Sequence, residues 1–302
     1  MTKSKNQQRT RRNKEYLVIT RDPENYKIFD LRANKPICYK DSPITGGDGS
    51  MVLQEIEYIE SSRKINEMNN DLEYFAPNNV GILLSIARKS LDSALNTFEE
   101  KLNPERIDHV ISKQDGDRKE QIINQSKIMY DYIEFIQSSI VFGFTALEAF
   151  VNLSIPEGYE YKFENNKGII EVYNKEAIER WLPLRTKIAE ILVSIYNTKP
   201  IKSINLWNMF CSFEEHRNEI IHQKSITHTN FYKKYFKKQI FELCSTPQGI
   251  IKFFFEERSP KNGTNALWPW VINTDNDFPI NYEYKSEQFE ITGNIYEGRS
   301  KK

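Results

Sequence analysis

Cysteine is scarce in this chain, and neither sign of charge predominates. The 302 residues include three cysteines, Cys38, Cys211 and Cys244, which are widely spaced and form no CxxC pair. This spacing argues against a disulfide framework and against a zinc site, so we expect a reducing, cytoplasmic compartment. Lys plus Arg and Asp plus Glu both total 42. A nucleic-acid site must therefore come from a local patch, because the whole chain has no charge bias.

Long apolar runs and phosphate-binding loops are also missing. No run approaches the ~20 apolar residues that span a bilayer, and no apolar stretch follows the basic N-terminus, so we expect a soluble protein. The glycine-rich segment 46–49 lacks the Lys-Ser/Thr pair of a nucleotide-binding loop. No Gly-x-Ser-x-Gly elbow occurs either. These absences exclude ATP-driven and serine-hydrolase chemistry, and we expect no cofactor and no metal.

Apolar residues recur at helical spacing through much of the chain, which predicts a mainly α fold. The expected helices and amphipathic segments cover about residues 80–102, 118–153, 175–196, 203–223, 230–244 and 248–256. Residues 159–173 predict a β-hairpin inserted between helices. Asn174 and Ser203 are the expected N-caps of the two helices that follow.

Strand-like segments flank this helical region at both ends of the chain. Residues 16–20 and 26–31 predict an N-terminal hairpin, and residues 52–75 are ambiguous between strand and helix. Short strands are expected at residues 282–284 and 289–292. We therefore divide the chain into a β-containing N-terminal extension, a helical domain and a C-terminal extension, at residues 1–75, 80–256 and 257–302.

The helix expected at residues 203–223 carries an arginine where an apolar residue would be usual. At 100° per residue, Arg217 falls near the centre of the apolar face. A guanidinium is costly to bury, so it must meet a carboxylate or line a pocket that receives an anion. Asn218 and His222 lie one turn apart at the edge of that face, where their side chains can converge on one ligand.

A fixed cation, an amide and an imidazole are the groups needed to break a phosphodiester through its own 2′-hydroxyl. Imidazole titrates near neutrality and can take or give the proton, while a forked cation stabilises charge on the phosphoryl oxygens. This chemistry requires no metal.

Residues 215–222 resemble the motif of the HEPN family, in which an Arg and a polar residue precede a His near the end of a helix. Residues 144–152 are similar to a helix of HEPN-related bacterial proteins, and the resemblance covers about residues 80–256. It implies an antiparallel helical bundle and a homodimer whose two motifs share one cleft. It also implies metal-independent cleavage of RNA, often by toxins or phage-defence effectors that have an antitoxin or regulatory partner. Arg217, Asn218 and His222 match the motif, and Glu148 is a looser match that would orient Arg217.

Two alternatives leave out catalysis. In the first, Arg217 pairs with Glu148 only to hold the bundle, and His222 caps the helix through its favourable interaction with the dipole. In the second, the chain is a non-catalytic HEPN scaffold that binds RNA, a nucleotide or a partner protein. The intact Arg, Asn and His set favours the enzyme, because a scaffold has no need of a free imidazole.

Lysines alternate with aromatic residues just after the motif, a pattern that can hold phosphates and stack bases. The candidate RNA-binding lysines are Lys224, Lys233, Lys234, Lys237 and Lys238. At helical spacing, however, Phe231, Tyr235 and Ile240 form a core stripe and the lysines form a solvated face. This second interpretation is the stronger of the two.

Overall fold

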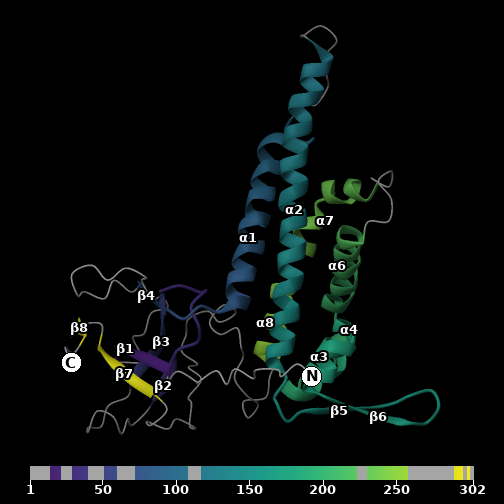
Figure 1. Ribbon diagram of the computed structural model, residues 1–302. Helices are drawn as coiled ribbons and strands as arrows, with labels where there is room; N and C mark the ends of the chain where they lie inside the picture. The colour runs from purple at the N-terminus through teal and green to yellow at the C-terminus, as the bar shows by residue number, and fades with distance from the viewer. Residues whose placement is uncertain are drawn as a thin grey trace, which may run out of the picture. The chain divides into compact units, whose positions relative to one another are not determined.

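Helices make up most of the described part of the chain, which confirms the predicted mainly α class. The structure, a computed structural model, describes residues 14–21, 29–39, 51–59, 72–107, 117–222, 230–257, 289–294 and 298–299. The chain divides into a smaller unit, residues 1–78 and 273–302, and a helical unit, residues 79–272. Figure 1 shows the helices and strands of both units.

The smaller unit is built on one six-stranded sheet. Its strands are β1 (Lys14–Thr20), β2 (Ile37–Tyr39), β3 (Met51–Ile59), β4 (Leu72–Phe75), β7 (Phe289–Asn294) and β8 (Gly298–Arg299). Strand β1 pairs antiparallel with β3 and parallel with β7. The predicted hairpin between residues 16–20 and 26–31 is therefore wrong, because both edges of β1 are occupied by other strands. The strand expected at 289–292 lies within β7, and residues 282–284 are outside the described part.

The helical unit begins with two antiparallel helices. Helix α1 (Asn79–Thr97) continues into the π-helical turn η2 (Phe98–Leu102), and α2 (Arg118–Ser154) packs against α1. Asp117 begins α2, because its carboxylate accepts a hydrogen bond from the Lys119 amide at 2.9 Å. These helices agree closely with the expected segments 80–102 and 118–153.

A β-hairpin follows α2, as the sequence predicts. Strands β5 (Glu160–Glu164) and β6 (Ile170–Asn174) pair antiparallel, and Gly168 takes a positive φ of 74° in the turn. Asn174 caps the next helix, because its Oδ1 accepts a hydrogen bond from the Ala177 amide at 2.9 Å.

The single helix expected at 175–196 is wrong, because the chain forms two helical stretches there, residues 175–181 and 184–196, which comprise four elements. They are α3 (Lys175–Trp181), α4 (Leu184–Thr186), the π-helix η3 (Lys187–Leu192) and α5 (Val193–Tyr196). Pro183 causes the break, because a proline removes an amide donor and disfavours helical geometry in the residue before it. Leu182 accordingly has extended backbone angles, φ −89° and ψ 137°.

The last helices complete the helical unit. They are the short 3₁₀ turn η4 (Ile201–Ser203), α6 (Asn205–Ile221), the 3₁₀ segment η5 (Asn230–Phe236), α7 (Gln239–Cys244) and α8 (Thr246–Glu257). Ser203 lies in η4 and does not cap α6, whose N-cap position is Ile204. The Ser203 hydroxyl instead donates to the Pro200 carbonyl at 2.7 Å.

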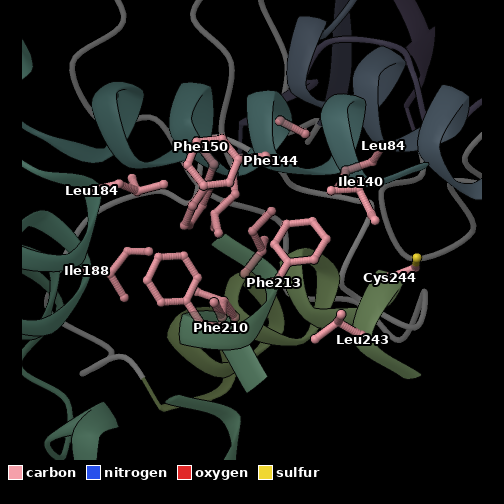
Figure 2. Packing of buried hydrophobic residues seen from close by; sticks show 14 of the residues in the cluster. Leu84, Ile140, Phe144, Phe150, Leu184, Ile188, Phe210, Phe213, Leu243 and Cys244 are labelled. Carbon is pink, nitrogen blue, oxygen red and sulfur yellow. The ribbon is translucent and has the colours of Figure 1, made fainter. Parts of the chain in front are cut away.

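One apolar core joins the helices of this unit. Phe144 and Phe150 of α2 face Phe210 and Phe213 of α6, and Figure 2 shows these rings between the two helices. Phe144 and Phe213 are stacked, with ring centroids 6.4 Å apart. This stack fixes α6 against α2 one turn before Arg217 and so positions the candidate site.

The expectation about apolar runs needs a correction at α2. This helix contains a stretch that is long and apolar enough to cross a membrane by length and composition alone. Half of that stretch is buried inside the helical unit, and the core helix of a soluble protein has the same composition. The buried apolar residues of α2 pack against α1, α6 and α8.

Candidate active site

Arg217 points from α6 towards α2, as its place on the helical wheel predicts. Its guanidinium carbon lies 4.6 Å from the centroid of the Phe144 ring, which is a cation–π contact. Its Nη1 donates a hydrogen bond to Asn218 Oδ1 at 3.0 Å. Among the described residues, no carboxylate lies within ion-pair distance of Arg217. The half-buried cation therefore retains donors that can bind an anion.

Asn218 and His222 lie about 100° and about 140° from Arg217 around α6, and both are exposed. Because Asn218 Oδ1 accepts from Arg217, the two amide protons of Asn218 are left for another acceptor. His222 follows the last residue of α6, and its backbone amide donates to the Asn218 carbonyl at 2.9 Å. The imidazole thus stands at the C-terminus of α6.

Glu148 does not form the ion pair that would orient Arg217. It lies one turn beyond Phe144 on α2, and within the described residues no ion pair joins it to Arg217. The cation on which its charge acts is Lys187, the first residue of η3. The alternative in which Arg217 pairs with Glu148 only to hold the bundle requires the same ion pair. That alternative therefore loses its main contact.

Lys187 is a buried lysine that the sequence patterns did not single out. Only 2% of its surface is exposed, and its Nζ donates to Asn152 Oδ1 at 3.1 Å and to the Glu179 carbonyl at 2.9 Å. Burial lowers the pKa of Lys187, while the charges of Glu148 and Glu179 oppose that shift. Lys187 therefore links α2 to the end of α3 beside Glu148.

A second cluster lies on another side of α6, against η5. His216 Nδ1 hydrogen-bonds the Ser212 carbonyl at 2.8 Å, and its ring stacks on Tyr235 at 6.4 Å between centroids. Glu219 accepts from Lys234 Nζ at 2.6 Å. His216 is half-buried because η5 packs over it. This cluster holds η5 on α6 near the candidate site.

The candidate RNA-binding lysines fall into two groups in the structure. Lys234 and Lys238 are paired with Glu219 and Glu105, at 2.6 and 2.8 Å. Lys233 and Lys237 are exposed and have no ion-pair partner among the described residues. Lys224 lies outside the described part of the chain. Below the lysines, Phe231 and Tyr235 are buried, in agreement with the core-stripe interpretation.

The sequence patterns missed the residue that supports Arg217, which is Phe144. One sequence signal could have indicated this contact. An aromatic residue lies on the apolar face of one helix and a cation lies on the apolar face of another, and a cation and an aromatic ring attract each other when the two faces pack together.

Comparisons with known proteins identify no relative of this chain. No family model, no curated protein and no solved structure matches it. Among the described residues, no group of three or more His, Cys, Asp or Glu side chains could hold a metal ion.

Proposed function

We propose that this protein is a metal-independent endoribonuclease of the HEPN type, acting as a toxin or an anti-phage defence effector. The observation that carries the proposal is the state of Arg217. Its guanidinium is half-buried against Phe144, lacks a carboxylate partner among the described residues, and adjoins an exposed amide and an exposed imidazole. A cation placed in this way costs free energy unless it has an anionic ligand, and an RNA phosphate is such a ligand.

The reaction needs only groups that the chain provides. A base removes the proton of the ribose 2′-hydroxyl, whose oxygen attacks the adjacent phosphorus. The bond from phosphorus to the 5′-oxygen breaks, and an acid protonates that oxygen. The products are a 2′,3′-cyclic phosphate and a 5′-hydroxyl. His222 would transfer protons, while Arg217 and the Asn218 amide would stabilise the charge on the phosphoryl oxygens.

Two copies of the chain would bring together the cation and the imidazole, which lie apart within one copy. Within one chain, Arg217 and His222 are about 140° apart around α6, at 100° per residue, so the cation and the imidazole face different directions. A two-fold axis beside α6 would bring the imidazole of each copy towards the Arg217 and Asn218 of the other. The proposal is therefore a homodimer with one shared cleft, in which one His222 acts as the base and the other as the acid.

Incubation of purified protein with total RNA in excess chelator tests the activity. We expect cleavage to persist in the chelator and to leave 2′,3′-cyclic phosphate ends. Arg217→Ala and His222→Ala should each lower the rate by roughly 10²-fold or more, which is typical of losing a charge-stabilising or acid–base group. Arg217→Lys should also lose activity, because an ammonium group cannot reproduce the planar, two-pronged donor geometry of a guanidinium. His216→Ala is the matched control, because it removes an imidazole on another side of the same helix.

The test also separates the enzyme from the alternative, a scaffold that binds RNA, a nucleotide or a partner protein. A folded protein that binds RNA but does not cleave it under any of these conditions would favour the scaffold. A strict requirement for an added divalent metal, or near-normal activity of folded His222→Ala, would refute the mechanism.

Mixed dimers test the shared cleft. If His222 residues of both copies act on one bond, dimers of wild-type and His222→Ala chains should lose more than half of the activity. Activity that falls only in proportion to the fraction of wild-type chains would mean that each copy acts alone.

A further inference from the structure

The N-terminal third of α2 extends beyond the helix that packs against it. The ring of Phe98, in η2, lies 5.9 Å from that of Tyr132, and η2 ends four residues later at Leu102. Helix α2 continues in the other direction to Arg118, and Figure 1 shows this part projecting past α1. The N-terminal half of α2 also carries exposed apolar side chains, since Ile123 is 44% and Tyr130 is 67% exposed.

Four exposed residues of this half of the helix lie on one narrow strip. They are Lys119, Ile123, Tyr130 and Glu134. At 100° per residue, all four fall within a sector of about 60°, and the strip is about 22 Å long at 1.5 Å per residue. Neither Lys119 nor Glu134 has an ion-pair partner among the described residues. The strip thus has two apolar residues between a free cation at one end and a free anion at the other, with Ser126 and Lys127 beside its centre.

The order of these residues makes the strip complementary to itself. Lys119 and Glu134 lie equally far on either side of the point between Ser126 and Lys127, and so do Ile123 and Tyr130. When two copies of a helix pack antiparallel across a two-fold axis at such a point, equidistant residues face each other. Lys119 then faces the Glu134 of the second copy, Ile123 faces its Tyr130, and each contact occurs twice.

We propose that this strip in the N-terminal half of α2 is a self-association surface whose partner is the same strip of a second copy of this chain. The two apolar contacts bury Ile123 and Tyr130, and the two ion pairs at the ends set the antiparallel register. Ser126 is compatible with a close approach at the centre, because its small side chain donates to the Ile122 carbonyl of its own helix at 2.7 Å. This surface is separate from Asn218 and His222, so it does not depend on the proposed ribonuclease activity.

Charge reversal with rescue tests the surface in the full chain. Lys119→Glu and Glu134→Lys each turn two attractive contacts into two repulsive ones, so each should raise the dissociation constant of self-association by roughly tenfold or more at low salt. The double variant Lys119→Glu/Glu134→Lys restores opposite charges and should return the constant to near the wild-type value. Sedimentation velocity over a range of protein concentrations measures all three.

Two neighbouring residues provide matched controls. Arg118→Glu and Asp131→Lys make the same charge changes at exposed positions that lie about 90° or more from the middle of the strip, so they should leave association unchanged. If copies also associate through α6, the single reversals should lower the assembly to the α6 dimer, and the double variant should restore it. A wild-type chain that is monomeric, single reversals that behave like the controls, or a double variant weaker than either single one would overturn the proposal.

Discussion

The contact between Arg217 and Phe144 can be measured by a double-mutant cycle. Arg217→Met removes the cation but keeps an unbranched side chain, and Phe144→Leu removes the ring but keeps an apolar residue in the core. If the ring attracts the guanidinium, the loss of the cation should cost more free energy of unfolding when Phe144 is present than when it is replaced.

The expected coupling follows from the burial of the pair. Phe144 is only 6% exposed, whereas Arg217 is half-buried. A cation–π contact is worth about 0.5–1 kcal/mol at an exposed site and about 2 kcal/mol when desolvated, so a half-buried pair should be coupled by about 1 kcal/mol. Phe144→Leu should itself cost about 1–2 kcal/mol, because it leaves space beside Phe213. The change in free energy of unfolding on Arg217→Met should then be less favourable by about 1 kcal/mol in the wild-type chain than in the Phe144→Leu chain.

Urea unfolding followed by far-UV circular dichroism gives the four free energies of the cycle. The slope of the free energy with urea should be the same in all four proteins, because none of the changes alters the surface exposed on unfolding by much. A coupling energy below about 0.3 kcal/mol would refute the reasoning, since that is the range in which independent sites are additive. Arg217 would then be held by its hydrogen bond to Asn218 alone.

Three other changes test the helical unit. Asn174→Ala should lower the free energy of unfolding by about 1 kcal/mol, because it removes the N-cap of α3, and Asn174→Asp should restore most of it. Burial lowers the pKa of Lys187, so the unfolded chain binds more protons between that pKa and the ordinary lysine value of about 10.4, and stability contributed by this group rises with pH there. The wild-type chain should therefore gain stability relative to Lys187→Met as the pH rises towards the ordinary lysine pKa, and a stability difference that stays constant with pH in urea unfolding would contradict this. Burial also raises the pKa of Cys244 to about 12, so a thiol reagent at neutral pH should label Cys244 only as the chain unfolds, and rapid labelling of the folded protein would contradict its burial.

The local sequence pattern alone predicts the elements that depend mainly on interactions between residues close together in the chain. The apolar period of residues 118–153 predicts α2 to within a residue at each end, and the turn-like residues between 164 and 170 predict the β5–β6 hairpin. Asn174 caps its helix as expected because capping involves only the next three residues. The rotation of 100° per residue also predicts that Arg217 faces the core, and its guanidinium does lie over the Phe144 ring.

Contacts between distant residues were decided only by the tertiary structure. Strand β1 pairs in parallel with β7, about 275 residues later in the sequence, and no local pattern records which strand takes a free edge. Lys238 forms an ion pair with Glu105. The charge of Glu148 acts on Lys187, and Glu148 forms no ion pair with Arg217 among the described residues. Amino-acid periodicity determines which face of a helix is buried. The partner of each charge depends instead on which helices pack together and on their relative positions along the helix axes, because an ion pair forms only where two side chains come within reach.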